Sequence, residues 1–270
     1  MNDEVRDDTA IWRYMDLPKF VAMLASDTLW FAKAKHLEDN YEGFCQAKAG
    51  EMPQNDPHSK CITRTTAGGE TAVISVTQML VESSKNAAAY FENARDHLYV
   101  NSWCLADESM AMWEIYGSNG GGIAVKSSVG QYRRAARFEM WEEQYAYGKV
   151  EYEDDPHSNP ALNFDFSAGP IPLPGSGVWE KLLPVAFHKR TCFAHEREWR
   201  GALYQDPRAD CYGCNINFDL KELISVVYVG PRADNLFFDI AGSIMEKFGL
   251  QKPLERSTLL GPVHKGGTAS

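Results

Sequence analysis

Hydrophobic and polar positions in the first thirty residues predict a strand, a short helix and a second strand. Residues 11–15 (IWRYM) are aromatic and β-prone, as are residues 28–32 (TLWFA). Between them, Asp16 stands where a helix N-cap is expected, Pro18 falls in the first turn, and apolar residues follow at helical spacing. The chain therefore opens with two aromatic strands joined by a helix.

The remaining elements are predicted from the same periodicities. Strands are expected at short runs of β-prone residues, namely 99–104, 123–125, 197–204 and 225–229, with a weaker edge strand at 145–152. Helices are expected where apolar residues recur every three to four positions, namely 71–97, 109–116, 178–195 and 235–248, the last ending at Gly249.

The irregular mixture of elements predicts an α+β fold, with a mixed or antiparallel central sheet flanked by helices. We expect a single domain over residues 11–260, a disordered N-terminus at 1–10 and a flexible tail at 261–270. Residues 155–177 are rich in Pro, Gly and Ser, which favours a long loop insertion on the surface.

Composition limits the classes of protein to consider. The chain has 270 residues, of which 44% are hydrophobic and 12% aromatic, as in a globular protein with a substantial core. A net charge of −10 disfavours binding to duplex nucleic acid, which needs a basic surface. No run approaches the roughly 20 apolar residues of a membrane span, and the acidic N-terminus resembles no targeting peptide, so a cytoplasmic protein is expected.

The six cysteines are widely spread, which predicts reduced thiols rather than a disulfide framework. Cys211 and Cys214 form a single CxxC pair. A zinc site would need two more ligands at compatible spacing, and none lies nearby in sequence, so two thiols in a turn are the expected reading and no metal is predicted.

Four clusters of polar and aromatic residues are candidates for chemistry. The first joins Arg13 and Tyr14 to Trp30 on the next predicted strand. Strand alternation places Arg13 on the face opposite Tyr14. A guanidinium suits a phosphate or carboxylate, and the aromatic rings can stack on a base. An arginine bridged to a carboxylate beside core aromatics is an equal alternative.

The second cluster is the acidic run at residues 36–43, which contains Glu38, Asp39 and Glu42. Its Asp and Asn residues favour a simple loop bend. Its carboxylates could also approach a cation or a sugar hydroxyl, although a metal site would need further ligands.

The third cluster follows the strand at 99–104. It consists of a serine, a possible helix of Met and aromatic residues, and an acidic residue between them: Ser102, Trp103, Glu108, Met112, Trp113 and Tyr116. Such a helix beside a sheet can form the wall of a pocket for a flat ligand. Met and Trp at helical spacing are also typical of core packing. The glycines at 120–122 lead into a strand and lack the Lys-Ser/Thr of a phosphate loop.

The fourth cluster is a polar row late in the chain. Lys189 precedes it, and on the strand predicted from residue 197 alternation places Glu196, Glu198 and Arg200 on one side. A row of this kind either faces solvent or, if it faces the interior, must neutralise its charges. The apolar continuation of the strand favours a functional site.

In this order, the four clusters resemble the uncharacterised bacterial domain family DUF2971 over residues 11–260. The resemblance rests on short motifs: Trp12-Arg13-Tyr14, LWFA at 29–32, the strand with Ser102, the helix Met112-Trp113…Tyr116-Gly117, and Lys189…Phe193…Glu196…Glu198…Arg200. The acidic loop departs from the family pattern, because it lacks a proline and changes the Asn/Asp order, which puts a role for Asn40 in doubt. The resemblance implies a fold rather than an activity.

The layout is also similar, more loosely, to that of ADP-ribosyltransferases, which place an Arg or His, a Ser or Tyr, and a Glu on successive strands around NAD. That similarity implies NAD as a substrate. It also implies that Arg13 holds the pyrophosphate or an adenosine hydroxyl, that Tyr14 or Tyr116 stacks on nicotinamide, and that Ser102 positions it.

In the same analogy Glu198, or alternatively Glu196, bonds the ribose 2′-hydroxyl and stabilises the positive charge that develops as nicotinamide leaves. Because analogy of layout does not establish function, two alternatives stay open. One is a non-catalytic module that senses a nucleotide or a peptide. The other is a nuclease or toxin-type effector, which the acidic composition disfavours.

Overall fold

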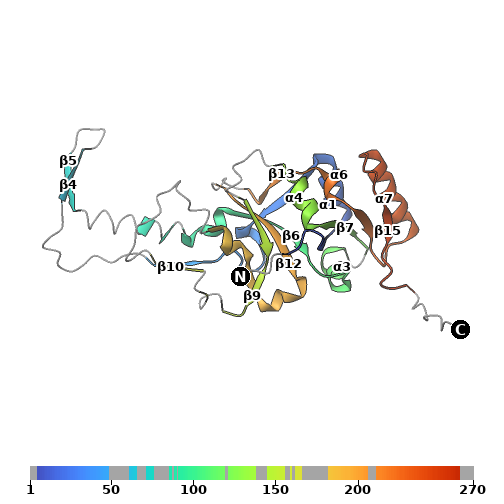
Figure 1. Cartoon of the computed structure of the whole chain (residues 1–270), viewed down its shortest axis with the longest axis horizontal. Coiled ribbons are helices and arrows are strands. Elements are labelled where there is room, and N and C mark those ends of the chain that lie inside the picture. The colour runs from blue at the N-terminus through green and yellow to red at the C-terminus, as the bar shows by residue number, and fades with distance from the viewer. Residues whose placement is uncertain are drawn as a thin grey trace.

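Nine strands pair into one sheet in the part of the chain that the computed structural model describes, which comprises residues 5–48, 61–65, 71–75, 85–86, 88–89, 91–118, 121–137, 145–155, 159, 162–165, 182–205 and 211–261. Together with the helices around it, this sheet confirms the predicted α+β class (Figure 1). Most of its pairings are antiparallel, and β14 with β15 is parallel, so the sheet is mixed.

The strands of the large sheet are β1 (Ala10–Met15), β2 (Thr28–Lys33), β6 (Leu98–Cys104), β7 (Ile123–Ser128), β8 (Tyr145–Lys149), β12 (Glu198–Tyr204), β13 (Gly213–Asn217), β14 (Val226–Val229) and β15 (Leu254–Arg256). Three two-stranded ribbons pair β3 (Gln46–Lys48) with β10 (Asn163–Asp165), β4 (Cys61–Thr65) with β5 (Thr71–Ser75), and β9 (Glu151–Glu153) with β11 (His188–Arg190).

The α-helices with defined bounds are α1 (Leu17–Ser26), α3 (Met110–Tyr116), α4 (Val129–Ala135), α6 (Leu220–Leu223) and α7 (Asn235–Lys247). Short 3-10 helices are η1 (Ala34–His36), η2 (Ala94–Asp96), η6 (Leu183–Phe187) and η7 (Thr191–Glu196).

Strand β6 organises the sheet. One edge of β6 pairs along its whole length with β12. The other edge is shared by two strands, since Trp12 of β1 lies opposite Cys104 and Ala32 of β2 lies opposite Val100. Strands β1 and β2 therefore separate from each other beside the middle of β6.

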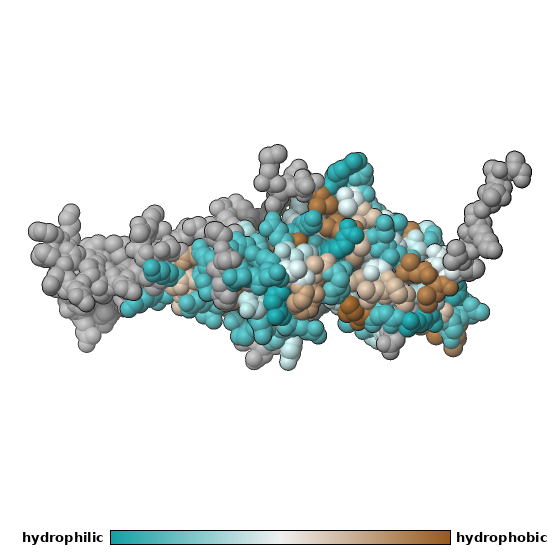
Figure 2. Space-filling view, turned by 90° about the horizontal axis from the view of Figure 1, so that it is seen from below, coloured by the Kyte–Doolittle hydropathy of each residue, from teal (hydrophilic) through white to brown (hydrophobic). Residues whose placement is uncertain are grey.

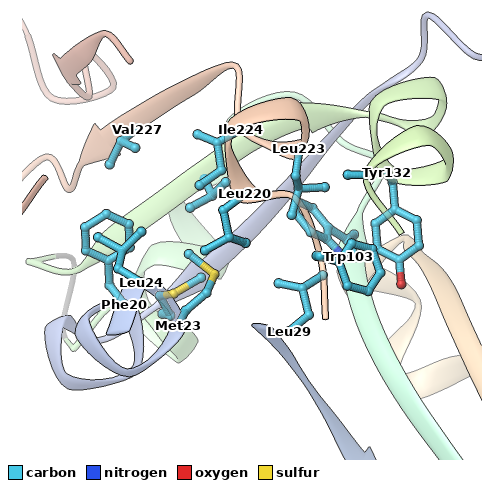
Figure 3. Close-up of a cluster of buried hydrophobic side chains, with 14 of the residues drawn as sticks. Phe20, Met23, Leu24, Leu29, Trp103, Tyr132, Leu220, Leu223, Ile224 and Val227 are labelled. Carbon is cyan, nitrogen blue, oxygen red and sulfur yellow. The ribbon is translucent and has the colours of Figure 1, made fainter. Parts of the chain in front are cut away.

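One face of the sheet, here called the α1 face, carries the main core. Helices α1, α4, α6 and α7 contribute to it, and Trp103 of β6, Trp199 of β12 and Tyr132 of α4 are fully buried within it. In Figure 3, Trp103 and Tyr132 lie in the same cluster as Leu29 and Leu223. Burial of this much apolar surface is the main stabilising contribution to the fold.

The opposite face, here called the charged face, has two smaller apolar clusters instead of one. The first includes Val100 and Ala202, and the second includes Trp12, Cys104 and Trp113. Along β6 the stretch between the clusters is occupied by Ser102. A polar segment is thus held between two apolar ones on this face.

Local signals account for the elements that were predicted well. The carboxylate of Asp16 accepts a hydrogen bond from the backbone N–H of Lys19 at 2.8 Å and caps α1, with Pro18 in its first turn. Helix α7 ends before Gly249, which has a φ of +67°. Strands β1, β2, β6, β7, β12 and β14 lie within a few residues of their predicted ranges.

Two predicted helices are wrong. Residues 71–75 form β5 against β4, and helical residues in the described part of 71–97 begin at 85. From 183 to 196 the chain forms η6, β11 and η7 rather than a helix, while 178–181 lie outside the described residues. In both places pairing with another strand outweighs helical periodicity, a dependence on tertiary context that propensity does not capture.

The predicted loop and termini are described only in part. Most of 155–177 lies outside the described residues, and within it Asn163–Asp165 is a strand rather than loop. Residues 1–4 and 262–270 are also outside. The predicted disordered N-terminus needs a correction at its end, because the carbonyls of Asp7 and Thr9 accept hydrogen bonds from Gly130 and Val129.

Hydrophilic residues predominate on the surface in Figure 2, and hydrophobic ones gather toward the end of the molecule where α7 lies. Exposed large hydrophobic side chains there include Leu236 and Ile240 of α7. None of the helices within the described residues combines the length and apolar character of a bilayer span.

Candidate active site

The register of β12 on β6 decides which predicted site residues share a face. Glu198 lies opposite Cys104, and Arg200 lies opposite Ser102. Trp12 of β1 is also opposite Cys104, so Trp12, Cys104 and Glu198 form one row across three strands. Because alternate strand residues point to the same side, Ser102, Glu198 and Arg200 all belong to the charged face.

Five charged side chains meet on this face and form what we call the ion cluster: Glu42, Lys189, Glu196, Glu198 and Arg200. All five were predicted as site residues, and all are buried. They come from a loop, a short strand, a 3-10 helix and β12, so the fold gathers segments that are far apart in sequence.

Lys189 contacts all three carboxylates of the ion cluster. Its Nζ lies 2.8 Å from Glu196 Oε2, 2.8 Å from Glu198 Oε1 and 3.1 Å from Glu42 Oε1. Three acceptors match the three N–H donors of an ammonium group. These neighbours outweigh the effect of burial and raise the pKa of Lys189, so it stays charged.

Arg200 holds the same carboxylates from the other side. Its Nε donates to Glu198 Oε2 at 2.6 Å and its Nη2 donates to Glu198 Oε1 at 2.9 Å, a bidentate pair. Its Nη2 also donates to Glu42 Oε2, and its Nη1 donates to the Ala186 carbonyl at 2.9 Å. Arg200 is 1% exposed, so these hydrogen bonds replace the ones that its guanidinium would otherwise make with water.

Glu196 and Glu198 share this site with opposite effects on their pKa values. Burial, followed by the hydrogen bond and the charge of Glu198, raises the pKa of Glu196 to about 7. Burial also opposes the charge of Glu198, but Arg200 and Lys189 outweigh it and hold the pKa of Glu198 well below its usual range. Near neutral pH one carboxyl is therefore ionised while the other lies close to its titration midpoint.

A proton on Glu196 balances the ion cluster. Two basic and three acidic side chains carry a net charge of −1 when all are ionised. An uncompensated buried charge is unfavourable, which is the physical reason why one carboxyl takes up a proton. A pair of carboxyls whose environments separate their pKa values is a recurring arrangement for acid and base roles.

Helix α3 connects the ion cluster to the surface. The hydroxyl of Tyr116 donates to Glu196 Oε1 at 3.2 Å, while the Tyr116 side chain is 40% exposed. Burial of its hydroxyl, together with the charge of Glu196, raises the pKa of Tyr116, so the hydroxyl keeps its proton and donates a hydrogen bond to the carboxylate. Tyr116 is thus the surface-exposed neighbour of an interior carboxyl.

The rest of α3 is fixed by aromatic and polar contacts to β1. The ring of Trp113 packs edge-on against Tyr14 with centroids 5.0 Å apart, and its Nε1 donates to Glu108 Oε1 at 2.8 Å. The Tyr14 hydroxyl accepts from the backbone N–H of Ser109 at 3.0 Å. Met112 is buried in the same apolar cluster. These predicted ligand-binding residues lie on the charged face, where they support α3.

Three predicted site residues lie outside both the ion cluster and the contacts of α3. Trp103 is buried in the core of the α1 face, where its Nε1 donates to Asn101 Oδ1 at 2.7 Å. Trp30 lies on β2 with its side chain 44% exposed. Arg13 alternates with Trp12 and Tyr14, so its side chain points to the α1 face, away from Glu198.

Arg13 fills the space where β1 and β2 separate. Its Nη2 is 3.4 Å from the Trp30 carbonyl, which also accepts a hydrogen bond from Asn101 Nδ2 at 2.8 Å. Its Nη1 is buried without a hydrogen-bond partner among the described residues, and burial lowers the pKa of Arg13 to about 10. The structure therefore does not bring Arg13 together with Ser102 and Glu198 on one face.

Two contributors to the site were not predicted. The hydroxyl of Tyr152 on β9 accepts a hydrogen bond from the backbone N–H of Glu198 at 2.8 Å. Arg95 holds the loop that carries Glu42 through its backbone carbonyls. Both residues stand in polar stretches outside the four clusters considered above, and their contacts to the site join segments far apart in the sequence, so no local pattern identified them.

No group of three or more His, Cys, Asp or Glu side chains within the described residues is arranged to hold a metal ion. Cys211 and Cys214 are both half-buried, and Cys211 Sγ lies 3.5 Å from the Tyr99 hydroxyl. Two surface hollows lie away from the ion cluster: one is lined in part by Asp27 and Arg137, and the other by Cys45 and Phe164.

Comparison with known proteins adds little to this description. No family model matches the chain, so the resemblance to DUF2971 stays a prediction, and no curated protein matches it. Among solved structures it is similar to Thermus sp. 2.9 DarT in complex with NAD+, at 8% identity and a TM-score of 0.37 over 94% of this chain and 97% of that one. It is also similar to Thermus sp. 2.9 DarT in complex with ADP-ribosylated ssDNA, at 9% identity and a TM-score of 0.37 over 95% and 98%. Similarity at this level supports no conclusion about activity.

Proposed function

We propose that this chain is an enzyme that transfers the glycosyl group of a nucleotide, with NAD as the first substrate to test. The proposal rests on one observation: two adjacent buried carboxyls, Glu196 and Glu198, have pKa values displaced in opposite directions and are joined to the surface by Tyr116. Displaced pKa values around a specific partner set are typical of functional sites.

Glu198 has the properties needed to stabilise a developing cation. Its carboxylate stays ionised through Arg200 and Lys189. In glycosyl transfer the bond between ribose C1′ and the nicotinamide nitrogen breaks, the electron pair leaves with nicotinamide, and positive charge develops on the ribose. A fixed carboxylate close to that charge lowers the barrier.

Glu196 has the properties of a general base. With a pKa of about 7, it is partly deprotonated at neutral pH and can take the proton of an acceptor hydroxyl, or of water, as the new bond to C1′ forms. The proton then resides on Glu196, next to Tyr116 and the surface. Ser102, directly across from Arg200, is the proposed residue for orienting nicotinamide.

Substrate access requires a change at Tyr116. Glu196 and Glu198 are 6% and 3% exposed, and the Tyr116 hydroxyl covers Glu196. A ligand that displaces this hydroxyl would take its place beside Glu196 and find an aromatic ring to stack against. Arg13 has no role in this proposal, because its side chain lies on the other face of the sheet.

The test is nicotinamide release from NAD by the purified chain and by Glu198→Gln. We expect release by the native protein and a loss of at least about a hundredfold in the variant, because the carboxylate that stabilises the cation is removed. Glu151→Gln is the matched control, since Glu151 is an exposed strand glutamate on β9, and it should retain full activity.

Release that persists in Glu198→Gln, with both proteins folded, would refute the assigned role. A second candidate function is a nucleotide-binding module without turnover. It is favoured by the ion cluster itself, in which Lys189 and Arg200 already have carboxylate partners from the chain and need no substrate to neutralise them. In that case NAD at a hundredfold excess over its Kd would stabilise the fold by about 2.7 kcal/mol without releasing nicotinamide.

A further inference from the structure

The loop between η1 and β3 delivers two carboxylates to consecutive residues of β11. Asp39 is fully buried, and its Oδ1 lies 2.8 Å from Nε of Arg190. Glu42 lies three positions later in the same loop and contacts Lys189 at 3.1 Å. The loop therefore attaches to β11 at two adjacent points, one of which belongs to the ion cluster.

Arg95, just before β6, holds the inner side of this loop. Its Nη2 donates to the Ala34 carbonyl at 2.8 Å, and its Nη1 donates to the Asn40 carbonyl at 2.9 Å. Longer contacts reach the carbonyls of Leu37 at 3.5 Å and Asp39 at 3.4 Å. A planar guanidinium with five donors suits several carbonyls in a bend, whereas an ammonium group does not.

The packing around Arg95 leaves little room for another loop conformation. Gly43 has a φ of +72°, and a Cβ at this position would lie 3.1 Å from Ala34 Cβ and 3.3 Å from Arg95 Cγ. A glycine is therefore required where the loop folds back on Arg95. Glu42 immediately precedes this glycine, so its direction is set by the same contact.

We propose that Arg95 is a positioning residue that holds the loop 34–43. Its role is to place Glu42 in the ion cluster, where Glu42 completes the set of carboxylate partners of Lys189 and Arg200. The consequence for activity rests on the proposed function, whereas the consequence for the ion cluster does not. Arg95 itself does not touch the carboxyls of Glu196 and Glu198 in any hydrogen bond or ion pair of the described residues.

The titration of Glu196 reports whether Glu42 is in place. The charged and titratable groups that face Glu196 directly are Cys104, Tyr116, Lys189 and Glu198, and Arg197 follows it in the chain. Glu42, Arg200 and Tyr152 act on it through their contacts with Lys189 and Glu198. If Glu42 leaves, one negative charge is lost while both cations remain. The ionised form of Glu196 is then favoured, and its pKa falls.

The sign of this change distinguishes positioning from a direct electrostatic effect. Loss of the positive charge of Arg95 by itself would raise the pKa of every nearby carboxyl. Displacement of Glu42 would lower the pKa of Glu196. A fall in the Arg95 variant therefore means that the loop has moved.

The experiment is an NMR titration of the Glu196 carboxyl in Arg95→Met, Glu42→Gln and the double variant, with assignment by Glu196→Gln. We expect the pKa to fall by about one pH unit in each single variant and no further in the double variant, because both changes remove the same charge. Arg95→Lys keeps the charge without the planar fork, so no loss of charge opposes the fall, which should be at least as large. It also provides a variant if Arg95→Met does not fold.

Arg134→Met serves as the control, since Arg134, on α4 and outside the loop 34–43, is an exposed partner of Glu222 and should leave the Glu196 titration unchanged. An unchanged or raised pKa in the Arg95 variants, or additive falls in the double variant, would overturn the proposal. Because no substrate is present, failure of the proposed enzyme activity does not affect this result. If nicotinamide release is observed, the acidic limb of its pH profile should move down with the Glu196 pKa.

Discussion

Glu196 and Glu198 differ in their partners rather than in their depth. Both side chains are buried, but Arg200 forms its bidentate pair with Glu198, whereas Glu196 is next to Lys189, the neutral hydroxyl of Tyr116 and the carboxyl of Glu198. Desolvation therefore dominates for Glu196 and charge compensation dominates for Glu198. Arg197 between them has a φ of +46°, an unusual value for a non-glycine residue at the turn into β12.

The raised pKa of Glu196 predicts how stability changes with pH. A carboxyl whose pKa rises from 4.5 in the unfolded chain to about 7 in the folded protein binds more protons when folded. Its contribution to stability is present below pH 4.5 and is lost as the pH rises through 7. We expect Glu196→Gln, which mimics the protonated acid, to gain stability relative to the native protein between pH 5 and pH 8 (a range of about three pH units around this pKa).

Urea unfolding of both proteins across that range measures the difference directly. Glu198, whose pKa is held well below its usual range in the folded protein, contributes to the slope of both curves alike, so the difference between the curves reports Glu196. The unfolding free energy of Glu151→Gln, a change at an exposed position, should vary with pH in parallel with that of the native protein. A Glu196→Gln curve parallel to the native one would show that the Glu196 pKa is not raised.

At the scale of elements, β12 is the strand on which both faces of the sheet depend. On the charged face it carries Glu198 and Arg200, and on the α1 face Gly201 receives the hydroxyls of two tyrosines. A Cβ at Gly201 would clash with the Tyr132 hydroxyl and lie 2.7 Å from the Tyr145 hydroxyl. The absence of a side chain there allows α4 and β8 to approach the middle of the strand.

Gly201→Ala should therefore destabilise the protein by about 1–3 kcal/mol, because rigid phenol groups have to move. Gly148→Ala on β8 is the matched control, since its Cβ would meet Phe187 at an ordinary 3.5 Å. Removing the obstructing hydroxyl with Tyr132→Phe should recover part of the loss in the double variant. Equal unfolding midpoints for Gly201→Ala and Gly148→Ala would contradict this account of the packing.

Elements with strong local signals could be predicted from the sequence, and elements that depend on a distant partner could not. The cap at Asp16 and the glycine stop at Gly249 act within one helix, and both are confirmed. In contrast, β11 pairs in parallel with β9, so that Arg190 lies opposite Glu153. No helical or strand periodicity within residues 188–190 indicates that partner, which lies over thirty positions earlier.

The candidate site shows the same limit. Alternation along β1 predicted that Arg13 points away from Tyr14, and the structure agrees. Strand register decides which residues of the other strands lie on the same side of the sheet as Arg13. For the same reason, neither strand alone predicts that Arg200 lies opposite Ser102. The acidic loop could be read as a bend, but its attachment to β11 and to Arg95 is a long-range property.

At the scale of the whole molecule, the ion cluster joins distant parts of the chain. Arg200 and Glu42 are separated by 158 positions, and their pairing connects β12 to the loop before β3. Buried ion pairs are weak evidence for stability, because desolvation offsets much of the attraction. Under the proposed function, the ion cluster is kept for the chemistry that it would carry rather than for the fold that it supports.

This explanation predicts a contrast between partial and complete removal of the charges. Arg200→Met alone leaves Glu42 and Glu198 buried without their guanidinium and should cost about 3–5 kcal/mol in urea unfolding at neutral pH. Replacing all five members of the ion cluster with Met or Leu of similar volume should recover most of that loss, since no buried charge is left unpaired. Nucleotide-dependent activity should be absent in both variants. If the apolar variant is no more stable than Arg200→Met, the charges are required for folding, and selection for the fold alone would account for them.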